Sequence, residues 1–375
     1  MKSVRPQRVQ VMTHIDYMKR ARELAERGRG KTSPNPMVGC VIVRGERIIA
    51  EGWHARCGGP HAEIAALAKA GARASGARMY VTLEPCAHFG RTPPCVDDII
   101  AHGLREVHIG TRDPNPLTRG KSVRALGRAG IKVSVGLLSR ELLKLNEAFF
   151  KMMNTGLPFT TAKIAASLDG KIATSTGQSE WITSSTSRRH AHLRRREFDG
   201  ILVGVNTVLK DNPGLESVPP SPRLVKIVVD SSLKTPERAK LFQGTNTSRV
   251  IIATTRRAPA KKIKRLSKLA QVWICPVKAG RVDLQWLWRA LGKHGLSNLL
   301  IEGGGEIISG ALKEKLVDKI HYYLAPKIFG DEQALSAVRG FRLTQVDEAL
   351  KLGDAQLTPL GRDIFYEGYV QYVRR

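Results

Sequence analysis

Three residues able to bind a metal ion lie in the first third of the chain, and their placement constrains how this region folds. Pro60 suits the first position of a helix, so His61 and Glu63 fall in the first turn of the helical run that follows. Cys86 comes directly after an apolar strand pattern, and Cys95 follows after eight intervening residues. A shared metal would therefore take one ligand from a helix start and two from the segment after a strand.

This set of side chains predicts a zinc site that performs chemistry. One histidine and two thiolates leave tetrahedral zinc a fourth position for water, whose pKa zinc lowers to about 7. Glu63 can take the proton of that water and deliver it to a ring nitrogen and a leaving amine. His-x-Glu followed by Pro-Cys and a second Cys is the pattern of zinc deaminases of nucleobases. A structural zinc site, or a capping histidine beside unrelated cysteines, is the less favoured alternative.

Length and composition indicate a soluble protein with more than one domain. The 375 residues predict two domains, since one domain has roughly 100–200 residues. Apolar residues form 42% of the chain, but no apolar run approaches the ~18 residues of a membrane helix, so we expect no membrane association. Residues 1–13 are basic and lack the apolar core of a secretory signal. We interpret them as a tail, with an organelle address as the weaker alternative.

Cysteine usage and net charge add information about compartment and partners. Five sparse cysteines fit a reducing cytoplasm better than a disulfide framework. We assign Cys40, Cys57 and Cys275 to packing, because a fourth protein ligand would close the catalytic position on zinc. A formal net charge of +28 attracts polyanions. This positive field would attract nucleic acid, phosphorylated small molecules or a phosphate-rich cofactor.

The pattern of elements predicts two α/β domains, residues 1–153 and residues 158–375, separated by turn formers at 154–158. The expected helices of the first domain are Ile15–Arg27, Ala62–Ala70, Val96–Ala101, Ser122–Ala129 and Glu141–Met153. Its expected strands are Met37–Val43, Arg47–Gly52, Arg78–Leu83, Glu106–Gly110 and Ile131–Val135. The second domain has a basic helix in Thr186–Phe198 and the expected strands Phe159–Ala165, Gly200–Val203, Val225–Val229, Val250–Ala253, Val272–Ile274, Asn298–Ile301, Ile320–Leu324 and Phe365–Tyr372.

Several motifs resemble one enzyme family. Cytidine and tRNA deaminases usually have two residues between the cysteines, whereas eight lie between them here. The stretches TSPNPMVG at 32–39, TLEPCAHFGRTPPC at 82–95 and DPNP at 113–116 resemble the deaminase domain of the bifunctional riboflavin biosynthesis family. ASLDGK at 166–171 and SEWIT at 179–183 resemble its reductase domain, and the resemblance spans about residues 14–373.

The resemblance implies a cytidine-deaminase-like α/β/α sandwich with one zinc ion, followed by a dihydrofolate-reductase-like α/β domain that uses NADPH. The implied substrate is 2,5-diamino-6-ribosylamino-4(3H)-pyrimidinone 5′-phosphate, which first loses its exocyclic amine. Its ribosyl group is then reduced to ribityl. In the deaminase domain the resemblance implies substrate contacts by Asn35, His54, His88 and Arg91. An amide and imidazoles suit the edge of a polar pyrimidine, and Arg91 can hold a phosphate.

In the reductase domain, three glycines after an apolar strand stand at the start of a helical run. The bare backbone amides of Gly304 and Gly305 can receive cofactor phosphate there. The resemblance implies further NADPH contacts by Ala165, Trp181, Thr207, Asp211 and Ser231. It implies substrate contacts by Ser179, Arg195, Leu215 and Glu302, and we add Lys163 as a further pocket residue.

One departure from the family pattern concerns phosphate binding. Members usually place Thr-x-Arg after a leucine that corresponds to Leu215, but here Glu216-Ser217-Val218 follow. An arginine that binds phosphate is therefore missing. Arg223, in a proline-rich loop, is one candidate to replace it.

Two other functions remain as alternatives: a zinc-dependent nucleic-acid deaminase of the tRNA type, and a basic RNA-binding protein on a degenerate scaffold. The long spacing between the cysteines and the reductase motifs disfavour the first. Intact Glu63 disfavours the second. We therefore expect a cytoplasmic, homo-oligomeric enzyme that acts on a small phosphorylated pyrimidine and not on nucleic acid.

Overall fold

The computed structural model describes residues 12–89, 93–221, 223–243 and 249–372. The chain divides into two compact units, Met1–Thr155 and Gly156–Arg375. Most of the expected basic tail lies outside the described residues, and its last residue, Thr13, is the N-cap of the first helix. None of the helices in the described ranges combines the length and the apolar character that crossing a membrane requires.

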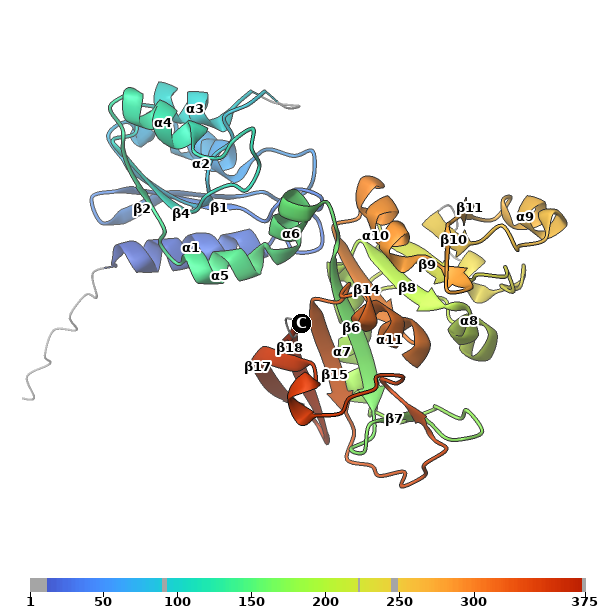
Figure 1. Cartoon of the computed structure of the whole chain (residues 1–375). Coiled ribbons are helices and arrows are strands. Elements are labelled where there is room, and N and C mark those ends of the chain that lie inside the picture. Colours follow the sequence, from blue (N-terminus) through green and yellow to red (C-terminus); the bar gives the residue numbers. More distant parts are fainter. Residues whose placement is uncertain (1–11, 90–92, 222, 244–248, 373–375) are drawn as a thin grey trace, which may run out of the picture. The chain divides into compact units, whose positions relative to one another are not determined.

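The first unit is built on a five-stranded mixed sheet (Figure 1). Its strands are β1 (Gly39–Arg44), β2 (Arg47–Trp53), β3 (Arg78–Leu83), β4 (Glu106–Thr111) and β5 (Lys132–Val135). They stand in the order β2-β1-β3-β4-β5, with β1 antiparallel to both of its neighbours and β3, β4 and β5 parallel. Cys86 therefore lies just beyond the carboxyl end of the central strand.

Helices cover both faces of this sheet (Figure 1). One face carries α1 (His14–Glu26) and α5 (Ser139–Leu145), and the other carries α2 (Ala62–Ala70), α3 (Cys95–Ala101) and α4 (Lys121–Arg128). Two glycines allow the close approach of helix to sheet, because a Cβ at Gly39 would clash with α1 and a Cβ at Gly52 with α2. The first unit is thus the expected α/β/α sandwich, with α2 held tightly against β2.

The helix expected at Glu141–Met153 is two helices, because α5 ends at Leu145 and α6 (Glu147–Thr155) follows. The intervening Asn146 is buried, and its side chain bonds both backbone groups of Met37, which lies 109 residues earlier. Its Oδ1 accepts from the Met37 amide at 2.8 Å, and its Nδ2 donates to the Met37 carbonyl at 2.9 Å. This residue therefore fastens the end of the first unit to the segment that carries Asn35.

The second unit contains a nine-stranded sheet in the order β11-β10-β9-β8-β14-β6-β15-β18-β17 (Figure 1). The strands are β6 (Phe159–Ala166), β8 (Gly200–Gly204), β9 (Val225–Val229), β10 (Val250–Thr254), β11 (Gln271–Ile274), β14 (Asn298–Glu302), β15 (Lys319–Leu324), β17 (Lys351–Leu360) and β18 (Asp363–Gln371). All neighbours are parallel except for the antiparallel pairs β15–β18 and β17–β18. The carboxyl ends of seven parallel strands thus share one edge.

Both faces of this sheet are also covered. Apolar residues pack α10 (Leu284–Lys293) and α11 (Gly305–Lys313) on one face, and α8 (Val205–Asp211) and α9 (Ala260–Leu266) on the other. Helix α7 (Ser185–Arg194) packs against β15 and β18 through Ala191, Tyr323 and Phe365. Two small ribbons, β7 (Lys171–Ala173) with β16 (Leu335–Ser336) and β12 (Val277–Lys278) with β13 (Arg281–Val282), complete the unit.

Candidate active sites

The three expected metal ligands meet in the first unit. His61 is the N-cap of α2, Cys95 is the first residue of α3, and Cys86 lies in the segment after β3. His61 Nδ1 is 3.1 Å from Cys95 Sγ and 3.6 Å from Cys86 Sγ, and the three ligand atoms all lie within 4.8 Å of one another. Two helix starts and one strand end thus converge on a single point.

This cluster fits zinc. Bonds of about 2.3 Å to sulfur and 2.0–2.1 Å to nitrogen place the ligand atoms of a tetrahedral site roughly 3.5–3.8 Å apart, close to the separations seen here. Two thiolates and an imidazole are donors that zinc prefers, and three protein ligands leave the fourth position open. The backbone amide of Cys95 also donates to Cys86 Sγ at 3.2 Å, which supports the thiolate form of Cys86.

Ionisable groups crowd this centre. The hydrogen bond with Cys95, together with that from His61, lowers the pKa of Cys86 to about 4. The same hydrogen bond and burial raise the pKa of the Cys95 thiol. Glu63 is only 3% exposed, and burial raises its pKa to about 7. The side chain of Glu63 therefore lies beside the ligands in an environment largely closed to solvent.

Two expected substrate contacts form a chain of hydrogen bonds that ends at Pro60, the residue before the metal ligand His61. His54 is 2% exposed; its Nδ1 is 2.9 Å from the carbonyl oxygen of Pro60, and its Nε2 is 3.2 Å from Asn35 Nδ2. A carbonyl only accepts, so His54 Nδ1 carries the proton and Nε2 accepts from the Asn35 amide. The Oδ1 atom of Asn35 is thereby left to accept from another group.

The other two expected contacts lie on the segment between the cysteines. His88 is half-buried, and its Nδ1 lies 3.0 Å from Thr118 Oγ1. Arg91 lies outside the described residues. The sequence argument did not anticipate the buried carboxylate of Glu84, which accepts hydrogen bonds from Ser122 Oγ at 2.8 Å and from the Asp113 amide at 3.3 Å. This carboxylate fastens the segment that starts at the end of β3 to the DPNP segment and α4.

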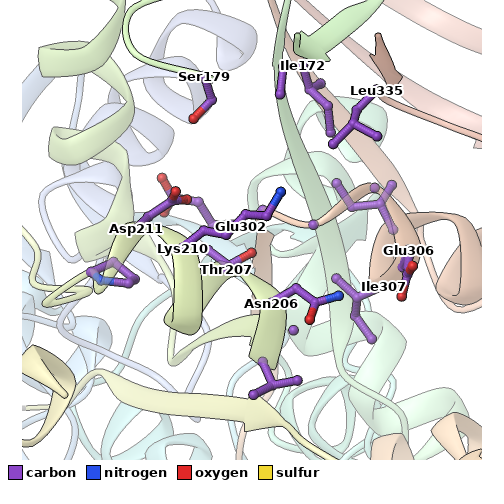
Figure 2. A pocket seen from close by; sticks show the side chains of 18 of the residues that line it. Ile172, Ser179, Asn206, Thr207, Lys210, Asp211, Glu302, Glu306, Ile307 and Leu335 are labelled. Atoms are coloured by element: carbon purple, nitrogen blue, oxygen red, sulfur yellow. The ribbon is translucent and has the colours of Figure 1, made fainter. Parts of the chain in front are cut away.

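A cavity of about 970 Å³ opens at the carboxyl edge of the parallel strands in the second unit. This is the edge at which α/β sheets commonly bind ligands. All twelve residues expected in the reductase site line it: Lys163, Ala165, Ser179, Trp181, Arg195, Thr207, Asp211, Leu215, Ser231, Glu302, Gly304 and Gly305. Figure 2 shows side chains from α8 and α11 turned into this cavity together with Ser179 and Glu302.

Glu302 is the centre of a charge cluster at one end of the cavity. Its carboxylate accepts two hydrogen bonds from Arg195, from Nε at 2.8 Å and from Nη2 at 3.0 Å, and lies 3.6 Å from Lys163 Nζ. Burial acts to raise the pKa of Glu302, but the charges of Arg195 and Lys163 outweigh it and hold the pKa at about 2. The glutamate is therefore an anion that orients two cations toward the cavity.

The backbone between β14 and α11 adopts positive φ values, which favour glycine. Gly303 and Gly304 have φ values of +104° and +79°, which disfavour any side chain. A Cβ on Gly303 would also lie 3.2 Å from the side chain of Thr207 on the facing helix α8. Bare backbone therefore lines the cavity here, and the start of α11 faces the space that a phosphate group can enter.

Glu216, which follows Leu215 where the family usually has Thr-x-Arg, makes two contacts within the protein. Glu216 pairs with Lys226, which is 1% exposed on β9, and the Glu216 carbonyl oxygen accepts from Arg195 Nη1 at 2.7 Å. Arg223 does not line the cavity. It lies before the first residue of β9, at the opposite edge of the sheet, where it lines a smaller hollow with Arg249. The candidate replacement for the missing arginine therefore lies at the wrong end of its strand.

Sequence reasoning missed other cavity residues. Arg188 and His192 of α7 line the cavity together with Arg195, the first residue of the turn that continues the helix, and the spacings of four and three residues place them on one face. The Arg188 guanidinium stacks over the Trp181 ring at 4.1 Å, and its Nη1 donates to the Thr183 carbonyl at 2.7 Å. The helical spacing from Arg195 was the signal that could have identified both residues.

Comparison with known families agrees with this geometry. The RibD C-terminal domain matches residues 158–366, and the cytidine and deoxycytidylate deaminase zinc-binding region matches residues 12–111. The two matches fall on the unit with the large cavity and the unit with the metal cluster.

Known proteins resemble the whole chain. The riboflavin biosynthesis protein RibD of Actinobacillus pleuropneumoniae is 43% identical over 95% of both chains, and that of Aquifex aeolicus is 42% identical over 94% of this chain and 98% of its own. The structure of RibD from Acinetobacter baumannii, form 2, superimposes with a TM-score of 0.85 at 33% identity, covering 95% of this chain and 98% of that one. The deaminase/reductase of Thermotoga maritima gives 0.82 at 34% identity, with the same coverage. The chain therefore belongs to the RibD family of riboflavin biosynthesis, as a bifunctional enzyme with a zinc-binding deaminase domain and a reductase domain.

Proposed function

We propose that this enzyme deaminates 2,5-diamino-6-ribosylamino-4(3H)-pyrimidinone 5′-phosphate in its first unit and reduces the product with NADPH in its second. The observation that carries the proposal is the presence in one chain of a zinc-type cluster beside buried Glu63 and a cavity lined by all twelve expected reductase residues. The named substrate follows from the family. The geometry of the two sites supports the roles of the individual residues.

In the deaminase site Glu63 moves the protons. Zinc, when bound, supplies the positive charge that makes water acidic enough to attack the ring at neutral pH. Glu63 accepts one proton of the attacking water and passes it to the ring nitrogen. It then takes the second proton from the hydroxyl now on the ring carbon and gives it to the amine, which departs as ammonia while the C=O bond forms. Asn35 Oδ1 accepts a hydrogen bond from a substrate N–H, since its Nδ2 is engaged with His54. The bond from His54 to Pro60 thus sets which edge of the pyrimidine is bound.

In the reductase site NADPH, when bound, supplies the hydride that reduces the sugar. A new C–H bond forms at C1′ while the bond from C1′ to the ring oxygen breaks, and the released oxygen takes up one proton. Lys163 is the cation of the cavity best placed to donate that proton, because Arg195 already neutralises Glu302. Arg188 on α7 and Arg195, the residue that follows α7, both line the cavity, and their positive charge attracts the 5′-phosphate of the substrate even though Arg195 is hydrogen-bonded to Glu302.

Two measurements on the intact chain test the proposal. Metal analysis of the purified protein should find about one zinc per chain. Incubation with the pyrimidine substrate and NADPH should release ammonia before NADPH is consumed, and the pre-deaminated intermediate should consume NADPH without releasing ammonia. Deamination of an RNA substrate at a comparable rate, or no NADPH oxidation with the intermediate, would contradict the assignment.

A further inference from the structure

One surface of the second unit is strongly basic and lies outside the proposed reaction sites. Residues 238–282 contain twelve lysines and arginines and no aspartate or glutamate, although the whole chain has 33 acidic residues. Among the residues that the structure describes, none between 238 and 279 lines the reductase cavity. Direct contact with the substrate or the cofactor therefore does not account for this basic segment.

Helix α9 packs on β10 and β11, at one end of the nine-stranded sheet, and carries a stripe of these cations (Figure 1). Lys261, Lys264 and Arg265 are exposed and share one face of the helix, because the second and third lie three and four residues after the first. The Lys268 amide donates to the Arg265 carbonyl at 3.2 Å, which continues the turn and adds exposed Lys268 to the stripe. Arg265 pairs with Glu237 at 2.7 Å, whereas the three lysines have no ion pair within the described part of the chain. The α9 stripe thus presents uncompensated positive charge along roughly 10 Å.

The chain continues from this stripe to a hollow of about 380 Å³ at the amino edge of the sheet. The first residue of β11, Gln271, lines the hollow together with Arg249 and His294. One N–H group of Arg249 donates to a backbone carbonyl at 3.0 Å, and its guanidinium has four more. Asp199 also lines the hollow, but its Oδ2 already accepts three hydrogen bonds from residues 297–298. The hollow is therefore a polar pocket rich in hydrogen-bond donors, of a size that can hold a small ligand group.

Several anionic partners bind basic surfaces, and the features of this one favour single-stranded RNA. A helix that binds a membrane surface buries its apolar face in lipid, but α9 packs Ile263 and Leu266 against its own sheet. Protein interfaces are depleted in lysine and enriched in aromatic side chains, the opposite of this stripe. Duplex DNA keeps its bases stacked, whereas a single strand can place an unstacked base in a hollow.

We propose that the α9 stripe and the adjoining hollow bind single-stranded RNA. The stripe contacts successive phosphates of the RNA backbone, and the hollow receives one nucleotide, which accepts hydrogen bonds from Arg249 and Gln271. This inference goes beyond the proposed function and does not depend on it. The RNA is a ligand and not a substrate, because the stripe and the hollow belong to the second unit and the metal cluster to the first.

Fluorescence anisotropy of a labelled RNA of about 16 nucleotides, titrated with the full chain, tests the stripe. The triple variant Lys261→Gln, Lys264→Gln, Lys268→Gln should bind about tenfold more weakly. Its slope of log affinity against log salt should be lower by about two, since each neutralised phosphate contributes roughly 0.7. The matched control is a triple variant on α4, which removes three exposed cations at the same helical spacing: Lys121→Gln, Arg124→Gln, Arg128→Gln. An equal loss of binding in the control would overturn the proposal, because binding would then depend on overall charge alone.

Competition at about 0.15 M salt with inorganic polyphosphate, duplex DNA and phosphatidylserine vesicles distinguishes RNA from the other partners. RNA should bind more tightly than each of them. Arg249→Gln should remove most of the advantage over polyphosphate, which has the charge of RNA but no bases. Equal or tighter binding of any competitor, or no RNA binding by the wild-type chain, would overturn the proposal and leave the deaminase and reductase assignments intact. NADPH oxidation by the α9 variant should be unchanged, which shows that the variant is folded.

Discussion

Arg195 and Glu302 join through two parallel hydrogen bonds, 2.8 Å from Nε and 3.0 Å from Nη2, inside the reductase cavity. Glu302 is the first member of a row of ionisable side chains that crosses four neighbouring strands. The register pairs Glu302 with Lys163, Lys163 with His321, and His321 with Glu367. Glu367 is the last member of the row, and Arg194 lies 3.6 Å from it. Two consecutive arginines, the last residue of α7 and the first of the turn after it, therefore each pair with the glutamate at one end of the row.

Replacing Arg195 should damage the reductase severely. Arg195→Ala leaves a buried carboxylate without its bidentate partner and removes a cation from the substrate end, so we expect kcat/KM for the deaminated intermediate to fall at least tenfold, about 1.4 kcal/mol or more. Arg223→Ala is the control and should change kcat/KM by less than twofold, because Arg223 does not line the cavity. Similar losses in both variants would contradict the placement of the phosphate.

Glu63→Gln should keep zinc and abolish deamination. The substitution retains the size of the side chain and all three ligands but removes proton transfer, which is typically worth 10²–10⁴-fold in rate. Metal analysis and ammonia release on the same preparation provide the readout, and NADPH oxidation with the deaminated intermediate should be normal. Loss of zinc together with activity would show that Glu63 holds the metal.

The stability of the second unit should depend on His321 at mildly acidic pH. Burial lowers the pKa of His321 to about 4 from an ordinary 6.5, despite the nearby Glu367 carboxylate at 3.4 Å. Between pH 6.5 and 4 the unfolded chain binds a proton that the folded chain does not, so stability falls as pH falls through this window. The shift corresponds to about 3 kcal/mol. Denaturant unfolding of His321→Gln should show a flatter pH dependence there, and an unchanged slope would exclude His321 as its source.

The pair of buried Lys226 and partly exposed Glu216 should contribute to stability. Glu216→Ala leaves the buried ammonium group with the Leu241 carbonyl but without a carboxylate, and should destabilise the second unit by about 2 kcal/mol. Lys226→Met removes the buried charge and places an apolar chain of similar length in the same space, so its cost should be smaller. Chemical denaturation of both single variants and the double variant checks this order. A double variant no more stable than Glu216→Ala would show that the buried charge is not the cause.

The second unit should work alone. A fragment from Asn154 to Arg375 retains the nine-stranded sheet and every residue that lines the reductase cavity. It should therefore oxidise NADPH when given the deaminated intermediate, at a rate within a few-fold of the full chain. A folded but inactive fragment would indicate that the reductase site requires residues of the first unit.

Local sequence patterns predicted most strands and the metal site, because both depend on short-range information. The strands Arg78–Leu83 and Val225–Val229 have the expected bounds, and the three ligands are identified by residue type and spacing. Long-range contacts explain the misses. Asn146 interrupts a continuous helical pattern because its side chain bonds Met37, and no local signal reports that partner.

The strand β17 was missed for a different reason. Its residues are almost all exposed at the edge of the sheet, so the sequence lacks the alternation that marks a half-buried strand. The hydrogen bond between Arg195 and Glu302 could not be predicted from the sequence either, because residue type alone does not tell whether an arginine binds a ligand or a neighbouring carboxylate.

The donor set of the metal cluster also fixes its charge balance. Two thiolates and a neutral imidazole carry a charge of −2, which cancels that of Zn²⁺, so the occupied centre is electroneutral within a chain of formal net charge +28. Long-range repulsion between the basic protein and the metal is thus compensated by the ligands themselves. Added salt should therefore leave zinc retention nearly unchanged, while it weakens the capture of phosphorylated substrate and dinucleotide, which the positive field attracts.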